Sequence, residues 1–303
     1  MLKNSRYHLI AFIIVVIWGT TFISTKMLLI NGLSPEDIFL YRFVLAYIGI
    51  RFVGKNRWFA KNWKDECILL LLGITGGSIY FLTENFAVKV TQVTNVAFIV
   101  CTAPLLTAIL SHLFLKNERL TRRLIQGSFL ALFGVALVVF NGKFILQLNP
   151  AGDLLSFLAA LSWAFYTILL KQVSSRYPIG FITRKVFFYG LLTILPAFIF
   201  HPLTTNMQLL SRPVIYLNIL FLGIAASLLC YFYWNIVIKH LGAIKATNFV
   251  YIVPIITLIA SSLILDETIT VYAIAGMMMI LAGVIWAERG GRFYRSRVKK
   301  PFE

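Results

Sequence analysis

Long apolar runs without Asp, Glu, Lys or Arg dominate the chain and alternate with short polar segments. Most of them are long enough to cross a ~30 Å hydrocarbon layer as a helix, which takes about 20 residues. The runs are Leu9–Thr25, Cys67–Thr83, Val90–Leu115, Leu124–Gly142, Leu154–Leu170, Val186–Ser211, Pro213–Ile238, Ala246–Leu265 and Ile269–Ala287. Ile38–Val53 adds a tenth if Arg42 is tolerated inside it. The pattern predicts an all-α integral membrane protein with ten transmembrane helices.

Composition agrees with this class. The chain is 59% hydrophobic and 13% charged, with a mean hydropathy of +0.85. A soluble domain fills its core with about half its residues apolar. The three cysteines are scattered among apolar runs and predict neither a disulfide framework nor a zinc site. We expect no metal and no cofactor.

The formal net charge of +17 reflects topology rather than nucleic-acid binding. If the predicted helices alternate, the basic segments 51–64, 116–123 and 289–300 lie on the side of the N-terminus. The basic residues on or near the other side are Lys26, Arg42, Lys89, Lys143 and Arg212. Such a bias predicts cytoplasmic termini in the plasma (bacterial inner) membrane. The tail, 290–303, is a cytoplasmic anchor near anionic lipid.

An acidic motif occurs twice. Glu118–Thr121 is followed by Gly127 and Gly134, and Glu267–Thr270 is followed at the same spacing by Gly276 and Gly283. Each copy follows an apolar run that contains a proline. The repeat divides the chain into five-helix halves, 1–143 and 150–289. Because five is an odd number, the halves enter the membrane from opposite sides, as in transporters built from inverted repeats.

Smaller matches between the halves lead to a family resemblance. Trp163 to Lys171 repeats the spacing of Trp18 to Lys26, although Ala164 replaces the glycine that follows Trp18. Trp18-Gly19-x-x-Phe22-x-x-x-Lys26, an early arginine in the second span and the doubled acidic motif resemble the EamA family of the drug/metabolite transporter superfamily. The resemblance covers about residues 8–288.

The resemblance implies two inverted five-helix repeats around a central cavity. It also implies export of amino acids or related small metabolites, often linked to protons. We therefore expect a secondary transporter that works by alternating access, with a passive channel or facilitator as the alternative. An enzyme is not expected, because the aspartates lie at span ends and no hydrolase or phosphate-binding motif is present. The expected partners are a small metabolite, the lipid bilayer and protons; monomer or homodimer stays open.

Aromatic and small polar side chains concentrate on the spans that the resemblance assigns to the cavity. Such a mixture makes an apolar pocket with a few hydrogen-bonding groups. For each one alone, core packing is an equal alternative to substrate contact. The candidates are Trp18, Thr21, Tyr80, Asn85, Asn95, Thr102, Trp163, Tyr166, Tyr231, Trp234, Asn235, Asn248 and Tyr251.

Charged residues within the predicted spans are the sharper signal. Lys26, Arg42 and Glu84 all fall toward the outer side, where they could form one ion-paired cluster. An unpaired charge there costs at least ~3 kcal/mol. The cluster either only locks helices together or has a function: Glu84 exchanges a proton, or Arg42 or Lys26 meets an anionic group of the substrate. Trp234 occupies the matching position in the second half, so Glu84 has no counterpart.

Two further pairs have a structural alternative. Pro104 and Pro254 lie in mid-span, where a proline bends a helix and shapes a cavity, or is merely tolerated. Glu118 and Glu267 precede helices, which they cap, and their placement on opposite faces also suits a gate.

Overall fold

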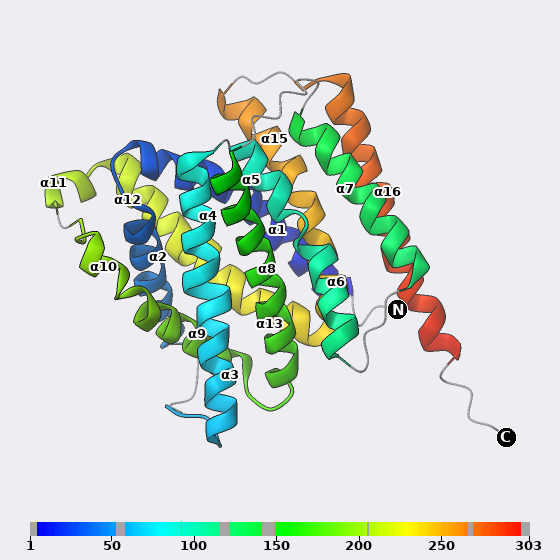
Figure 1. Ribbon diagram of the computed structural model, residues 1–303, viewed down its shortest axis with the longest axis horizontal. Helices are drawn as coiled ribbons and strands as arrows, with labels where there is room; N and C mark the ends of the chain where they lie inside the picture. Colours follow the sequence, from blue (N-terminus) through cyan, green and yellow to red (C-terminus); the bar gives the residue numbers. More distant parts are fainter. Residues whose placement is uncertain are drawn as a thin grey trace.

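The computed structural model describes residues 5–52, 58–91, 93–115, 121–140, 149–204, 206–265 and 269–297. These ranges are helices joined by short turns and contain no strand (Figure 1). The first half contains α1 Ser5–Ile30, α2 Pro35–Ile50, α3 Trp63–Gly73, α4 Ile79–Val90, α5 Val93–Val100, α6 Ala103–Phe114 and α7 Arg122–Phe140. The second contains α8 Pro150–Val173, α9 Ile179–Ile194, α10 Ala197–Phe200, α11 Met207–Leu210, α12 Pro213–Leu220, α13 Cys230–Leu241, α14 Ala243–Thr247, α15 Val253–Leu265 and α16 Val271–Arg297.

Helical length and composition fit a membrane protein. Eight helices of the described ranges are long and apolar enough to cross a bilayer: Ser5–Ile30, Trp63–Val90, Asn95–Phe114, Arg122–Phe140, Pro150–Val173, Ile179–Phe200, Pro213–Leu241 and Ala243–Ala260. The apolar helix Val271–Ala287 is shorter. Helix α2 has 16 residues and contains Glu36, Asp37 and Arg42.

Local sequence explains where helices begin. Ser34 caps α2, because its hydroxyl accepts from the Asp37 amide at 3.0 Å and the Asp37 carboxylate accepts from the Ser34 amide at 3.1 Å. Pro35 follows in the first turn, where a missing amide proton costs nothing. Asn149 caps α8 in the same way, ahead of Pro150. The Ser34-Pro35 pair thus begins the helix that contains the apolar run from Ile38.

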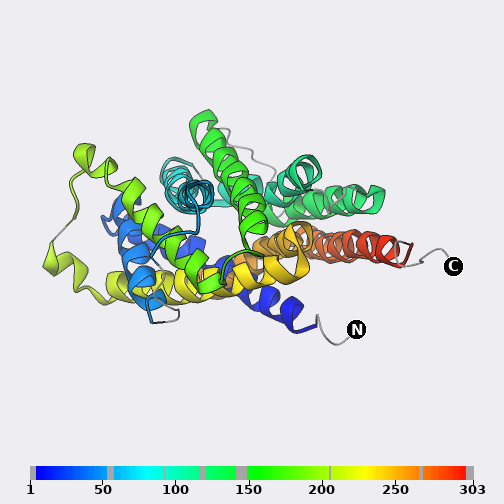
Figure 2. The ribbon, with the colours of Figure 1, turned by 90° about the horizontal axis from the view of Figure 1, so that it is seen from below.

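We call the side at which α4 ends and α5 begins the upper face, and the side at which α3 begins and α6 ends the lower face (Figure 1). Helix α1 packs on α13 and α15 of the second half, and α8 packs on α4 and α6 of the first. Helices α7 and α16 form a pair at one end of the molecule, and α10 and α11 lie at the other (Figures 1 and 2).

Glycines set the contact between α7 and α16. A Cβ on Gly127 would lie 2.5 Å from the Gly283 carbonyl oxygen, and one on Gly134 would lie 2.6 Å from that of Gly276. Only glycine allows the two backbones to approach so closely, as small residues do between membrane helices. The glycines of the repeated acidic motif therefore hold the antiparallel ends of the two halves together. The acids themselves, Glu118 and Glu267, lie outside the described residues.

Two ion pairs, one of them with both side chains buried, join the halves at the lower face. Glu66 of α3 pairs with Lys185 of α9, and their side chains are 8% and 5% exposed. The Glu66 carboxylate also accepts from the Tyr189 hydroxyl and from the Ala60 amide. Next to it, Asp65 pairs with Arg176, whose side chain is 45% exposed.

Candidate functional site

A cavity lies between the two halves, within about 550 Å³ of empty space that is partly open to the surroundings. Helices of both halves contribute its walls: Trp18, Thr21, Phe22, Arg42, Tyr80, Phe81, Glu84, Val100, Ala103, Trp163, Tyr231, Val250 and Val253. Glu84 lies six residues from the end of α4 at Val90, about 9 Å along the helix axis. The cavity therefore occupies the upper half of the bundle.

Two interrupted helices form one wall. The chain turns at Cys101 and Thr102 between α5 and α6, just before Pro104. In the second half, a 3-10 stretch, Asn248–Ile252, precedes Pro254. Proline has no amide proton and clashes with the preceding turn, so a break is expected before each proline. The residues beside these breaks, such as Ala103 and Val253, line the cavity. The prolines thus lie next to the cavity, while their functional role stays a prediction.

Two π-helical stretches lie at matching places in the halves, each ending two residues before a cavity-lining tyrosine, Tyr80 or Tyr231. Ile74–Ser78 connects α3 to α4, and Phe221–Leu229 connects α12 to α13. Helix α2 packs on the second stretch, and α9 packs on the first. π-Helical turns are rare in proteins, and those that occur are often found at functional sites.

Backbone carbonyls of the π stretches accept hydrogen bonds from side chains of the other half. The Trp18 indole N–H donates to the Ala226 carbonyl at 3.2 Å. The Ser162 hydroxyl donates to Thr75 at 2.7 Å, and the Tyr231 hydroxyl donates to Gly76 at 2.5 Å. Carbonyls displaced from the helical ladder must find such partners in a membrane. These bonds anchor two cavity aromatics, Trp18 and Tyr231, across the interface between the halves.

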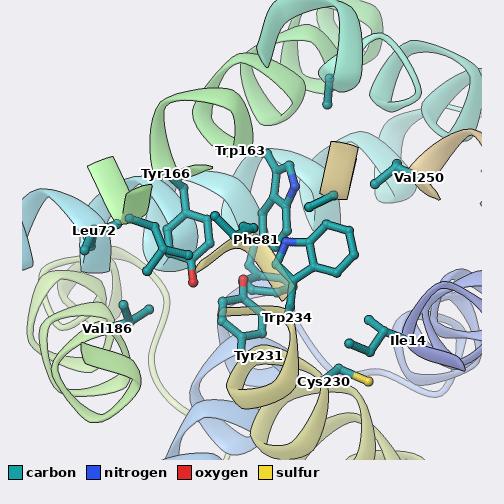
Figure 3. Packing of buried hydrophobic residues seen from close by; sticks show 14 of the residues in the cluster. Ile14, Leu72, Phe81, Trp163, Tyr166, Val186, Cys230, Tyr231, Trp234 and Val250 are labelled. Carbon is teal, nitrogen blue, oxygen red and sulfur yellow. The ribbon is translucent and has the colours of Figure 1, made fainter. Parts of the chain in front are cut away.

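Aromatic rings line the cavity. Figure 3 shows three of them, Phe81, Trp163 and Tyr231, packed close together. Trp163 lies edge to face with Trp18 at 5.3 Å between ring centroids and with Tyr231 at 5.7 Å. Tyr80 contacts Trp163 at 5.0 Å. Trp234 packs behind Trp18 at 4.8 Å and is fully buried. Edge-to-face pairs of this kind fix ring orientation and leave aromatic faces available to a ligand.

Two opposite charges face these aromatic rings. Arg42 is only 3% exposed; its Nε donates to the Ser227 hydroxyl at 2.9 Å, and its guanidinium lies 4.1 Å from the Phe81 ring centroid. The Glu84 carboxylate accepts from the Tyr80 hydroxyl at 2.9 Å. Both residues line the cavity, and no salt bridge joins them within the described part of the chain.

The three-residue ion cluster suggested by the sequence is not formed. Lys26 instead donates to the Val88 carbonyl at 3.2 Å. Arg42 and Glu84 each have a neutral partner, which leaves both charges directed at the cavity. All three residues lie toward the upper face, but Arg42 is bonded to Ser227 and Glu84 to Tyr80. Placement of that face on the outer side of the membrane stays a prediction.

Other candidates lie behind the cavity wall. The Tyr166 hydroxyl donates to the Asn235 amide oxygen at 2.6 Å, and the Asn235 amide donates to the Thr183 hydroxyl at 2.8 Å. These two hydrogen bonds are buried and connect α8, α13 and α9. Asn85 donates to the Pro35 carbonyl at 3.1 Å.

The remaining candidates border the helix breaks. Thr102 is bonded to the Ile99 carbonyl at 2.7 Å, and Asn95 is buried on α5. Asn248 and Tyr251 are buried on the 3-10 stretch. None of these four is among the cavity-lining residues, so substrate contact by them stays a prediction.

Sequence reasoning missed six lining residues: Phe22, Phe81, Val100, Ala103, Val250 and Val253. Phe22 was in the quoted tryptophan motif, and the four small aliphatic residues lie within four positions of Pro104 or Pro254. Apolar residues do not stand out in an apolar chain, so position relative to the prolines was the available signal. The described residues contain no group of three or more His, Cys, Asp or Glu that could hold a metal ion.

Membrane-length helices from two halves, interrupted beside a shared cavity, define a multi-pass membrane transport protein. The chain belongs to the EamA-like transporter family, whose sequence model matches residues 5–140 and again 150–288. The family resemblance drawn from the motifs is confirmed.

Curated relatives match almost the whole chain. An uncharacterized transporter of Archaeoglobus fulgidus is 27% identical over 93% of this chain and 96% of its own length. A probable amino-acid metabolite efflux pump of Salmonella typhimurium is 27% identical over 95% of this chain and 96% of its own. A protein of known crystal structure shares the fold, with a TM-score of 0.76 at 18% identity over 95% of this chain and 99% of that one.

Proposed function

We propose that the protein is a secondary transporter that exports amino acids or related small metabolites by alternating access. Its two five-helix halves are inverted repeats, and α2 and α16 complete ten membrane helices with the eight longer ones. The packing between the halves is reciprocal, which supports this topology. The first membrane helix of each half packs on the third and fourth membrane helices of the other: α1 on α13 and α15, and α8 on α4 and α6. The basic segments 51–64 and 116–123 favour a cytoplasmic lower face, with both termini inside the bacterial inner membrane.

The observation that carries the proposal is the pairing of unlike charges in one aromatic cavity. The Arg42 guanidinium suits the carboxylate of an amino acid. The Glu84 carboxylate, with the faces of Trp163 and Tyr80, suits its ammonium group. The apolar residues around them suit an aliphatic or aromatic side chain. The relatives named amino-acid metabolite efflux pumps support the same substrate class.

Counterflow in proteoliposomes tests this proposal. We expect labelled phenylalanine to exchange saturably and to be displaced by unlabelled phenylalanine. Phenethylamine and 3-phenylpropionate, each of which lacks one of the two charges, should compete at least ten-fold more weakly. Flux that does not saturate would instead identify a passive channel. Equal competition by all three compounds would contradict recognition of both charges.

Proton coupling through Glu84 is the second part of the proposal. Glu84→Gln keeps the shape of the cavity but can neither exchange a proton nor pair with the ammonium group of the substrate. Counterflow should therefore persist at a raised KM, while accumulation driven by a pH gradient is lost even at saturating substrate. Tyr80→Phe is the matched control, because it removes the hydrogen bond to Glu84 but keeps the carboxyl group. Full gradient-driven transport by Glu84→Gln would disprove coupling at this site.

A further inference from the structure

Buried polar groups without partners gather between α6, α7 and the 3-10 stretch Asn248–Ile252. They are Thr107 and Ser111 on α6, Ser128 on α7, and Asn248 and Tyr251 on the 3-10 stretch, and each is at most 1% exposed. Within the described residues, none of their hydroxyls has a hydrogen-bond partner, nor has either amide atom of Asn248. We call this set the inner polar pocket.

An apolar layer shows that these residues share one location. Ala108, Leu124 and Ile244 pack together with Ala287. Residues four apart lie on the same face of a helix, so Ser128 is one turn above Leu124 and Asn248 is about one turn above Ile244. Thr107 adjoins Ala108 on α6. The Tyr251 hydroxyl faces Ser128 without forming a hydrogen bond of normal geometry.

The inner polar pocket continues the cavity toward the lower face. Ala103 lines the cavity one turn above Thr107 on α6. Val250 lines it two residues after Asn248. The same two interrupted helices therefore carry the cavity wall above and the unpartnered groups below.

The chemistry of the pocket suits water. A buried polar group without a partner costs about 1–3 kcal/mol, so several together need a partner that the protein does not supply. Hydroxyls and an amide both donate and accept, and a bound water needs two to four such partners. The set carries no negative charge, which favours water over a divalent metal ion.

We propose that the inner polar pocket binds water and forms the part of the solute path that is closed in this structure, between the cavity and the lower face. Its role as a path rests on the proposed transport function. When the lower face opens, these groups meet solvent and the polar ends of the substrate. When it closes, they keep only bound water.

Hydroxyl-radical footprinting of the native protein tests the bound water. Radicals produced from water held in a protein oxidise the aromatic side chain beside it. Tyr251 and Tyr166 are both at most 1% exposed, but the Tyr166 hydroxyl is bonded to Asn235. We expect Tyr251 to be oxidised at least five-fold faster than Tyr166, with the oxygen derived from the solvent. Equal, slow oxidation of the two would overturn the water site.

Cysteine accessibility tests the path. Ser128→Cys should react with a membrane-impermeant thiol reagent added from the lower face, and a saturating substrate should change the rate at least three-fold. Ala131→Cys is the control, because Ala131 is fully buried on the same helix but packs in an apolar cluster. Peptide mapping separates both sites from the native Cys67, Cys101 and Cys230.

The outcomes separate this inference from the proposed function. Slow labelling of Ser128→Cys, equal to that of Ala131→Cys in every condition, would show that the pocket is not on the path even if transport is observed. If Ser128→Cys is labelled but the protein transports no amino acid, the pocket is still on a path open to solvent, and the proposed substrate class is wrong. Footprinting needs no transported solute, so its result on bound water is independent of the path and of the substrate assignment.

Discussion

Replacing Lys185 with methionine should destabilise the protein severely. Lys185 forms a buried ion pair with Glu66 and lies 5.0 Å from the ring centroids of both Phe59 and Tyr189. Methionine retains most of the packing volume but leaves the Glu66 carboxylate without its cation. Removal of one partner from a buried pair costs about 3–5 kcal/mol. We expect the free energy of unfolding to fall by that amount.

The double variant Glu66→Gln/Lys185→Met removes the stranded charge and should recover at least half of the loss. Recovery is expected because replacing a whole buried ion pair by neutral groups is often close to neutral. The assay is equilibrium unfolding in mixed micelles, arranged as a double-mutant cycle. A double variant as unstable as Lys185→Met would refute the argument that an uncompensated charge is the cause.

Arg176→Met provides a matched control at the same face. Arg176 pairs with Asp65, but its side chain is 45% exposed. Asp65 also keeps the Tyr177 hydroxyl at 2.7 Å and the Asn62 amide at 3.1 Å. The Asp65 side chain is only 3% exposed, but it keeps these two hydrogen bonds and its cation lies half in solvent. We therefore expect a smaller loss than in Lys185→Met, of about 1–2 kcal/mol. An equal loss in Lys185→Met and Arg176→Met would show that burial does not set the cost.

Two further substitutions test the helix contact and the cavity. Gly134→Ala places a Cβ 2.6 Å from the Gly276 carbonyl oxygen and should lower the free energy of unfolding by about 1–3 kcal/mol. Phe133→Ala is the control in the same unfolding assay. Because the Phe133 side chain is 59% exposed, its loss should cost less than half as much. Arg42→Lys keeps the charge but cannot reproduce the planar stack on Phe81 or present a two-pronged donor, so the KM for phenylalanine should rise at least ten-fold in proteoliposomes. An unchanged KM would place Arg42 outside substrate recognition.

Most helices could be predicted because hydrophobicity and caps are local properties. Ser34 and Pro35 mark the start of α2 by themselves, and the repeated glycines are small residues of the kind that close contact between membrane helices requires. Prolines likewise predicted where the spans are interrupted. Each of these signals is encoded within a few residues of its effect.

The cavity itself was only partly predictable. Arg42 and Glu84 stood out because charge is rare in an apolar run, but their partners, Ser227 and Tyr80, depend on helix packing and rotation. The π-helical stretches carry no distinctive sequence signal, although they place the carbonyls that hold Trp18 and Tyr231. Long-range contacts of this kind follow from packing between the halves, which no single segment encodes.

Divergence between the two halves adds a functional argument. Glu84 faces the cavity from α4, whereas Trp234 occupies the matching position on α13 and is fully buried. If the repeats exchange conformations as proposed, an acid faces the substrate when the upper face is open, and an indole replaces it when the lower face opens. Glu84 would then take up a proton from the outer solution while the upper face is open, and coupling requires that it release this proton toward the lower face when that face opens. Drift alone would leave Glu84→Gln silent, whereas coupling requires that this one position carry the pH dependence of transport.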